Sequence, residues 1–491
     1  MKTQSRKLIV CCVFSVLMVC PLAAVAIDRP GDDDIRFWVK DAINGDPYID
    51  SSGIDVGVSD GIVTLSGDVK NLISKTYADR EAKKISGVLG VINRLTVSPS
   101  DVNDTDIVQN VRRRIVDSAA IESQNIIVTC ADGKVKLTGE VASWSEGKQA
   151  GLLAGEVRGV KSIENDLTVN LMFTRSDEAV KKDIQDTLQR DVYLIGLPID
   201  VTVTYGFVTL SGTVGSEYQK SRAYEDVIWI ENVKNIKNDI LVQWWEEEGS
   251  RTKPPYNVTD TELAKAVTDE LQQDGRLDPR DLAITASYGH VTLIGSVADY
   301  YQKSVAEKDA HDVVGVGWIT NNLVVRAARR DDSEIGTDIL FEFSTDAALC
   351  DQDIKVNVNN GVVTLSGRVS TGYDREHALT VASRIRGVKE VKDKLEVNWK
   401  QEYKDADLMG RLMNRIKSNW LLSPVWDKIK INVRKGVVTL TGTVYNWGER
   451  REAERIVRNT SGVRAIDNRI QVEGYNYNWE DWYLKDSDGG S

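Results

Sequence analysis

Hydrophobic and polar residues alternate with a period of two in six places along the chain. In the first of these places, Ile54, Val56 and Val58 alternate with other residues. A "SDG" turn follows, and Val63 and Leu65 then continue the alternation. This period is typical of a strand with one buried face, so each place is predicted to form a β-hairpin.

The second strand of each hairpin lies in a heptad that begins and ends with glycine, "GIVTLSG" in the first copy. The glycine pairs are Gly61 and Gly67, Gly133 and Gly139, Gly206 and Gly212, Gly289 and Gly295, Gly361 and Gly367, and Gly436 and Gly442. The first glycine of each pair is predicted to form the turn with a positive φ. The second has the parity of the core-facing residues, and we expect its missing side chain to let a helix pack close to the sheet.

Helical patterns flank every hairpin. Eleven residues after the second glycine each copy has an alanine: Ala78, Ala150, Ala223, Ala306, Ala378 and Ala453. An amphipathic segment precedes each hairpin, and a last alternating strand begins with Asn or Asp 32 residues after the first glycine. The predicted fold class is therefore α+β, with six tandem αββαβ repeats, each a small mixed three-stranded sheet with two helices packed on one face.

The spacings between successive first glycines are 72, 73, 83, 72 and 75 residues, which replaces a length-based domain count with six small domains. We expect these domains at residues 32–99, 103–170, 175–244, 258–326, 329–399 and 403–474. Differences in length are expected in the first helix, its loop or the linkers. Residues 245–257 are predicted to be a linker between two triplets, most easily cut by trypsin at Arg251 or Lys253. Residues 475–491 are expected to be an acidic, aromatic tail that packs on domain 6.

At these residues the sequence resembles the BON (bacterial OsmY and nodulation) domain family. The resemblance depends on the "GxVxLxG" hairpin, the following helix, and endings such as "SGVLGVINRLTV" and "RGVKEVKDKLEV". Domain 3 departs from the pattern, because Asn232 replaces the glycine before the last strand, so that turn is expected to differ. The resemblance implies a non-catalytic, OsmY-like envelope module associated with phospholipid or surface contacts and with osmotic or envelope stress.

Residues 1–26 have the layout of a secretory signal: Lys2, Arg6 and Lys7, an apolar run, and Ala24-Val25-Ala26. Cleavage after Ala26 would export the chain to the periplasm, and an uncleaved inner-membrane anchor is the alternative. Removing the three cations takes the net charge from −12 to −15, which makes a non-specific nucleic-acid binder improbable.

Few residues suggest chemistry. Cys130 and Cys350 remain after cleavage, in different domains, so no disulfide framework is expected. Cys130 is interpreted as a small core residue. His290, His311 and His377 have no metal-ligand spacing, and no phosphate loop or nucleophile motif is found. The sequence therefore predicts no enzyme, no catalytic or metal site, no cofactor and no small-molecule substrate.

Binding is the class of function that remains, and the net charge differs between domains. Residues 403–474 carry 14 Lys and Arg against 8 Asp and Glu, whereas residues 258–326 carry 6 against 11. Domain 6 is thus the candidate for contact with anionic phospholipid or a partner. The candidate contact residues are Arg411, Arg415, Lys417, Trp420, Trp426, Arg450, Arg451 and Arg455.

The sequence leaves two interpretations of this region open. The apolar stripe and tryptophans of its first helix are either a core or a membrane face. At the level of function, a peripheral membrane protein competes with a soluble scaffold or chaperone-like adaptor that binds envelope proteins.

Overall fold

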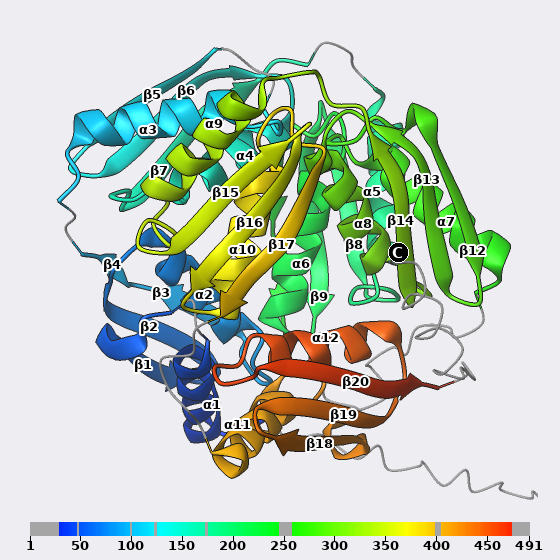
Figure 1. Cartoon of the computed structure of the whole chain (residues 1–491). Helices are drawn as coiled ribbons and strands as arrows, with labels where there is room; N and C mark the ends of the chain where they lie inside the picture. Colours follow the sequence, from blue (N-terminus) through cyan, green and yellow to red (C-terminus); the bar gives the residue numbers. More distant parts are fainter. Residues whose placement is uncertain are drawn as a thin grey trace, which may run out of the picture.

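A computed structural model describes residues 29–46, 49–98, 101–121, 125–171, 175–244, 258–397 and 404–473. The predicted signal (1–26), the predicted linker (245–257) and the tail (475–491) lie outside these residues. Six small sheets and twelve α-helices are described, and each sheet carries its own two helices (Figure 1). The predicted α+β fold of six αββαβ repeats is confirmed.

The first helix of every domain is 14 residues long. These helices are α1 (Asp32–Gly45), α3 (Asp104–Asp117), α5 (Asp177–Arg190), α7 (Asp260–Gln273), α9 (Asp332–Thr345) and α11 (Asp405–Ser418). Length differences therefore do not fall in the first helix. Domain 6 has two extra residues between α11 and its hairpin turn.

The hairpins occupy the predicted places. Their strands are β1 (Ile54–Ser59) and β2 (Ile62–Val69), β5 (Ile126–Ala131) and β6 (Lys134–Val141), β8 (Ile199–Thr204) and β9 (Phe207–Val214), β12 (Leu282–Ser287) and β13 (His290–Val297), β15 (Asp353–Asn359) and β16 (Val362–Val369), and β18 (Ile429–Arg434) and β19 (Val437–Val444).

The second helix and the last strand complete each unit. The helices are α2 (Leu72–Lys83), α4 (Trp144–Gly155), α6 (Glu217–Ile228), α8 (Tyr300–Asp312), α10 (Gly372–Ser383) and α12 (Trp447–Arg458). The last strands are β3 (Gly90–Asn93) with β4 (Thr96–Val97), β7 (Ser162–Val169), β10 (Asn235–Asn238) with β11 (Leu241–Val242), β14 (Trp318–Val325), β17 (Glu390–Val397) and β20 (Ala465–Val472). Each pairs in parallel with the second hairpin strand, as the crossover predicts.

The first glycine of each heptad has the predicted role. Asp60 and Gly61 both have positive φ, 51° and 78°, as the two central residues of a type I′ hairpin turn require. An aspartate at the start of the first helix holds this turn. In domain 5 the Asp332 carboxylate accepts hydrogen bonds from the backbone N–H groups of Asn360 and Gly361, at 2.8 and 2.9 Å.

The expected role of the second glycine is wrong. A Cβ on Gly67 would lie 2.0 Å from the carbonyl oxygen of Gly53, the residue just before β1, and not against the helix. Gly67 also has φ +110°, a conformation that side chains disfavour. The helix packs closely for a different reason, because the alanine of the second helix is fully buried in all six domains. Asn232 also keeps the turn of its glycine counterparts, with φ 68°.

The six domains form three pairs: 1 with 6, 2 with 5, and 3 with 4. In each pair, the residue after the first helix of one domain meets a residue one or two positions after the second helix of the other. The isolated β-bridges are Ile85 with Asn419, Ser118 with Ile385, Val157 with Asp346, Asp191 with Val313, and Ile230 with Asp274. The chain therefore folds back on itself, so that domain n meets domain 7−n.

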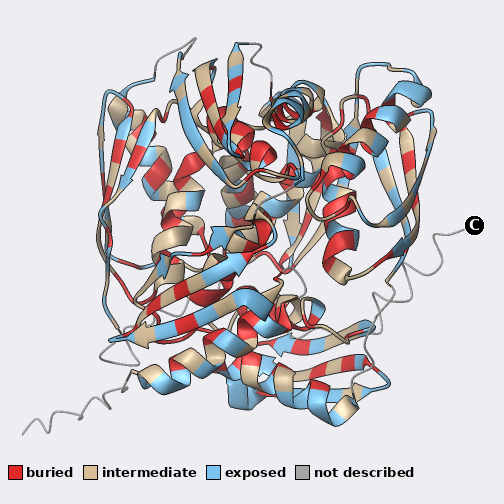
Figure 2. Cartoon of the chain, turned by 90° about the vertical axis from the view of Figure 1, so that its left-hand side faces the viewer, coloured by how far each residue is buried: buried red, intermediate tan, exposed pale blue. Residues whose placement is uncertain are grey.

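The second helices lie toward the middle of the molecule and the sheets toward the outside (Figure 1). Buried residues concentrate on the helices and on the strand faces that meet them (Figure 2). Each domain keeps its own apolar core, so the pairs join preformed units. Among the described helices, none has both the length and the apolar character needed to cross a membrane.

Candidate functional site

The structure places several of the predicted contact residues of domain 6 in its interior. Arg415, Trp420 and Arg450 are 4%, 8% and 8% exposed. The Arg415 guanidinium donates to the carbonyl oxygens of Gly45 and Asn459. These three side chains cannot meet a membrane while domain 6 is paired, so the prediction that they form a contact surface is wrong.

Other predicted residues join domain 6 to its neighbours. Arg455 forms an ion pair with Glu452 at 2.6 Å, and its Nη1 lies 3.6 Å from Glu81 of domain 1. Arg451 donates to the Val316 carbonyl of domain 4 at 3.1 Å. The Trp420 ring stacks on Tyr218 of domain 3, with centroids 5.1 Å apart. These basic and aromatic residues are therefore used for domain assembly.

Only part of the predicted set reaches the surface. Arg411 is half-buried, whereas Lys417 is exposed and Trp426 is 37% exposed. The Lys417 Nζ lies 5.1 Å from the centroid of the Trp426 ring, a cation–π arrangement. Met409 and Met413 are also exposed on α11, whereas the rest of its apolar stripe is buried. The first helix of domain 6 is thus mainly a core helix with a narrow exposed edge.

The outer face of the domain 6 sheet carries the exposed positive charge. Lys430, Arg434 and Lys435 are exposed along β18 and its turn. Arg464 and Arg469 are exposed on or before β20, at the other edge of the sheet, where Arg469 forms an ion pair with Asp467 at 2.7 Å. In residues 404–473, nine Lys or Arg but only three Asp or Glu are exposed. In residues 29–98 of domain 1 the exposed numbers are three and five. The basic character of domain 6 therefore survives at the surface, on the sheet.

The domain 2 sheet shows that a cation on this face does not always give a basic surface. Lys136 lies between two carboxylates there, with Nζ 2.5 Å from Glu164 and 2.6 Å from Asp166. These acidic neighbours raise the pKa of Lys136 and neutralise its charge locally. In domain 6, the described residues include no such acidic partner for Lys430 or Arg434.

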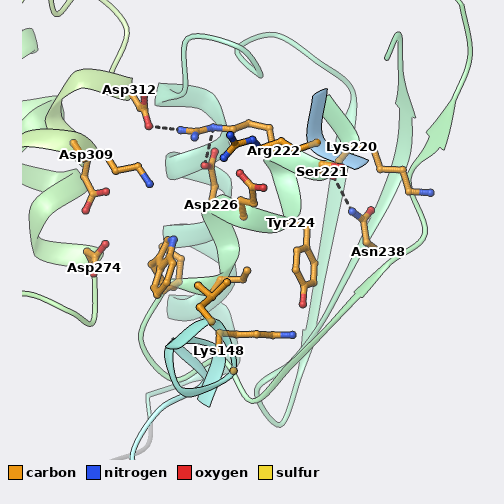
Figure 3. Close-up of a pocket in the computed structure, with 18 of the residues that line it drawn as sticks. Lys148, Lys220, Ser221, Arg222, Tyr224, Asp226, Asn238, Asp274, Asp309 and Asp312 are labelled. Carbon is orange, nitrogen blue, oxygen red and sulfur yellow. Dashed lines mark hydrogen bonds and ion pairs between the residues drawn. The ribbon is translucent and has the colours of Figure 1, made fainter. Parts of the chain in front are cut away.

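A cavity of about 820 Å³ lies around α6, at the junction of domains 1 to 4. Figure 3 shows Asp274, Asp309 and Asp312 on the domain 4 side of α6, with Lys148 and Lys220 on another side. Arg222 on α6 pairs with Asp312 across the interface at 2.7 Å. The charges that line the cavity tie domain 3 to domain 4.

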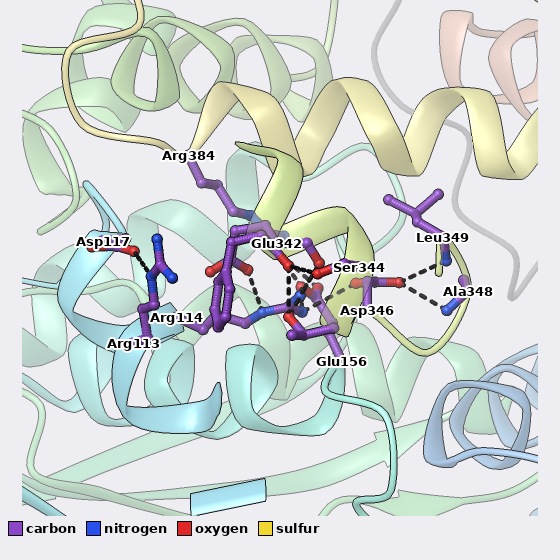
Figure 4. Close-up of polar contacts among 12 residues, drawn as sticks. Arg113, Arg114, Asp117, Glu156, Glu342, Ser344, Asp346, Ala348, Leu349 and Arg384 are labelled. Carbon is purple, nitrogen blue, oxygen red and sulfur yellow. Dashed lines mark hydrogen bonds and ion pairs between the residues drawn. The ribbon is translucent and has the colours of Figure 1, made fainter. Parts of the chain in front are cut away.

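A second polar cluster joins domains 2 and 5 (Figure 4). Arg114 pairs with Glu342 at 2.5 Å and with Asp346 at 3.0 Å, and Arg384 pairs with Glu156 at 2.9 Å. Although burial opposes it, His377 and Arg114 lower the pKa of Asp346. Although burial opposes it too, Asp346 raises the pKa of His377.

Glu156, Asp346 and His377 could be mistaken for a metal site, since their donor atoms lie within 4.8 Å of one another. Arg384 and Arg114 already occupy the carboxylate oxygens from the outside. A divalent cation at this point would lie against two guanidinium groups. The donor set therefore suits an ion-pair network and does not suit a metal.

Two further residues with suggested chemistry have structural roles. The Cys130 thiol is partly buried against the domain 2 core and donates to the Asp104 carboxylate at 3.1 Å. Burial and this carboxylate raise its pKa to about 11, which makes a poor nucleophile. His290 on the outer strand face contacts the Thr320 hydroxyl at 2.8 Å.

Sequence reasoning missed the residues that make the pairs. A buried Asp, Asn or Ser follows every first helix: Asp46, Ser118, Asp191, Asp274, Asp346 and Asn419. It stands 15 residues before the turn glycine in five domains and 17 before it in domain 6. The residue 24 after that glycine is Ile or Val in five domains and Thr460 in domain 6. This repeated spacing is the sequence signal from which the pairing residues could have been identified.

Comparison with known proteins agrees with this architecture. The BON domain model matches residues 31–99, 103–170, 176–243, 259–327, 331–398 and 404–474. Osmotically-inducible protein Y of Escherichia coli is 31% identical over 28% of this chain and 71% of its own length. Outer membrane lipoprotein DolP of Haemophilus influenzae is 30% identical over 27% of this chain and 71% of its own.

A solved structure was also found, the C-terminal domain of CdsD, a structural protein of the type III secretion system of Chlamydia trachomatis. It is 15% identical, covers 44% of this chain and 99% of its own, and has a TM-score of 0.12, which supports no argument. The six family matches and the two relatives carry the assignment. The chain belongs to the BON domain family.

Proposed function

We propose that the protein is a non-catalytic component of the bacterial envelope that binds anionic phospholipid through the outer sheet face of domain 6. The observation that carries the proposal is the excess of exposed cations on that face, in a chain whose net charge is −12. Relatives described as an outer membrane lipoprotein and as osmotically inducible support an envelope location and a part in osmotic-stress tolerance. A periplasmic location is part of the proposal.

The proposed attachment to the membrane is electrostatic. A Lys or Arg near an anionic leaflet contributes about 1 kcal/mol, so Lys430, Arg434 and Lys435 together contribute about 3 kcal/mol toward reversible attachment. Val437, 41% exposed in the same sheet, adds a small apolar contact. Because the charges are exposed, salt should weaken the attachment.

One observation favours a second function, that of a soluble adaptor for envelope proteins. The hairpin turns of domains 3 and 4 carry the exposed aromatic residues Tyr205 and Tyr288, which are 80% and 76% exposed. Aromatic side chains are common anchors in protein interfaces. This function would not need anionic lipid.

Vesicle sedimentation tests the proposal. The wild-type chain should sediment with vesicles of phosphatidylglycerol and phosphatidylcholine at low salt, and not with phosphatidylcholine alone. The variant K430E/R434E/K435E should lose at least tenfold in binding. The control K355E/K392E/K394E makes the same charge change on the domain 5 sheet and should bind like wild type. Equal losses of vesicle binding in both variants would mean that only the net charge of the protein matters. If the wild-type chain does not bind anionic vesicles, the adaptor function is favoured.

The tail, residues 475–491, is a separate part of the proposal. Residues 475–491, which are predicted to pack on domain 6, lie outside the described residues, and Arg450, Arg451 and Arg455 of domain 6 already have partners in the described structure. If the tail covers a basic surface, that surface is the sheet face. Deleting residues 475–491 should then strengthen vesicle binding, whereas weaker binding would make the tail itself a membrane contact.

A further inference from the structure

The pair interfaces use one backbone pattern but different side chains. In the pair of domains 2 and 5, four backbone hydrogen bonds of 2.7 to 3.3 Å cross the interface. Three cross the pair of domains 3 and 4, at 2.8 to 3.1 Å, and three cross the pair of domains 1 and 6, at 2.8 to 3.5 Å. Because all six domains of this chain offer this backbone, the hydrogen bonds alone do not choose a partner.

Charge differs at the eleventh residue of the first helix. In order along the chain, this residue is Ala42, Arg114, Thr187, Glu270, Glu342 and Arg415. In the pair of domains 2 and 5, the two residues at this position meet directly, Arg114 with Glu342. Both side chains are 3% exposed, so water screens their interaction little.

Charge also differs just after the second helix, 23 residues after the turn glycine. Domain 2 has Glu156 there and domain 5 has Arg384, and the two form a 2.9 Å ion pair. Domain 2 thus presents Arg and Glu at the two positions, and domain 5 presents Glu and Arg. Each position meets the opposite sign on the partner.

We propose that these two positions select the partner domain, through the cost of burying like charges. Domain 2 against domain 6 would place Arg114 against Arg415, and domain 4 against domain 5 would place Glu270 against Glu342. Domain 2 against domain 2 of a second copy would place Arg114 against Arg114 and Glu156 against Glu156. Specificity of this kind depends on rejecting wrong partners as well as on holding the right one.

The pair of domains 1 and 6 supplies a natural precedent for an uncharged partner. Domain 1 has Ala42 at the position where domain 6 has Arg415. Arg415 donates to the Gly45 carbonyl at 3.3 Å and lies 3.9 Å from Glu81 of domain 1. One arginine is therefore accepted at this point of the interface when its counterpart is small. Two arginines do not occur there in any described pair.

Disulfide trapping in the full chain tests the proposal. Ser118→Cys and Ile385→Cys are introduced into a chain whose five native cysteines are serine. The two residues form an antiparallel bridge, and residues paired in this way have Cα atoms within disulfide range. The fraction of chains that form the internal disulfide under mild oxidation reports whether domains 2 and 5 are paired.

Glu342→Arg should lower the trapped fraction at least tenfold, because the introduced guanidinium would face Arg114. Glu342→Gln, the neutral control, should change it less than twofold. Adding Arg114→Ala to Glu342→Arg leaves a single arginine at this position of the pair, as in domains 1 and 6, and should restore trapping to within twofold of wild type. Normal disulfide trapping in Glu342→Arg overturns the proposal. Failure of the double variant to restore trapping also overturns it, because Glu342 would then be needed for its packing and not for the sign of its charge.

Discussion

Asp346 in domain 5 and Asp191 in domain 3 occupy the same place and differ in their electrostatics. Each follows the first helix, is nearly fully buried, and accepts a hydrogen bond from the backbone N–H two residues later. Despite burial, His377 and Arg114 lower the pKa of Asp346. For Asp191, burial raises the pKa, and the nearby Asp312 adds to the shift.

The difference lies in how many cationic side chains pair with each aspartate. Arg222 pairs with Asp191, Asp226 and Asp312, whereas Asp346 has both His377 and Arg114. One backbone arrangement therefore supports a balanced interface between domains 2 and 5 and an acid-rich interface between domains 3 and 4. Stability of the two pairs should respond differently to mutation and to pH.

The largest expected effect comes from Arg222→Met. This change leaves the buried Asp191 and the partly buried Asp226 and Asp312 without the cation they share. Breaking a buried pair typically costs about 3–5 kcal/mol. The loss should be greatest at pH 8 and smaller at pH 5, where the carboxylates can take up protons. Urea unfolding at both pH values measures it. Arg158→Met, which breaks an exposed pair with Asp101, should cost less than about 1 kcal/mol; a similar cost for both variants would contradict the argument.

Glu270→Gln should stabilise the protein at high pH. Burial raises the pKa of Glu270 to about 7 from its usual 4.5. The free-energy penalty for ionising Glu270 in the folded protein is absent below pH 4.5, grows between pH 4.5 and pH 7, and is constant above pH 7. At about 1.4 kcal/mol per pKa unit, the gain at pH 8 is at most about 3 kcal/mol. Chemical denaturation at pH 4 and pH 8 tests this, with exposed Glu178→Gln as a neutral control; a destabilised variant at pH 8 would mean that the bond to Arg190 outweighs burial.

His377→Gln should destabilise the balanced interface, by about 1–2 kcal/mol. Gln149 holds the equivalent position in domain 2, so the substitution fits the fold. A raised His377 pKa means that its contribution is present below pH 6.5 and is lost as pH rises through the folded value. The lowered Asp346 pKa keeps that carboxylate charged above its usual 3.8. Thermal melts at pH 5.5 and pH 9 should therefore show a larger difference between variant and wild type at the lower pH.

The smallest expected effect is that of cutting the chain between its halves. Trypsin cleavage at Arg251 or Lys253 should release two three-domain fragments on a denaturing gel. Under native conditions these fragments should still elute together, because all three pairs join one half to the other. Early cleavage inside several domains would oppose the predicted linker.

The sequence was sufficient for the internal architecture of each domain, because the period of two, the helical spacing and the turn glycines are local signals. It was not sufficient for the pairs. Arg114 and Arg415 lie on amphipathic helices and are both buried against another domain, which the residue pattern of a single domain does not show. Charge counts by domain located the basic domain 6 but not its basic face, since a count does not distinguish Arg450 in the interior from Arg434 on the sheet.

Gly67 shows a second limit. Its parity indicated the core face, but parity gives no information on φ or on the approach of a neighbouring carbonyl. The six-fold recurrence of a glycine was interpreted correctly as a steric demand and assigned to the wrong neighbour. Long-range contacts of this kind become visible only when the strand register is known.

The pairing of domain n with domain 7−n is tested most directly by joining domains 1 and 6. Ile85→Cys and Asn419→Cys, in a chain without other cysteines, are 334 positions apart and form a β-bridge. The account predicts rapid formation of an internal disulfide, visible as a faster-migrating monomer on a non-reducing gel. The mismatched pair Ile85→Cys and Asp346→Cys should stay reduced. Equal yields for the two variants, or no disulfide between positions 85 and 419, would contradict the fold-back arrangement.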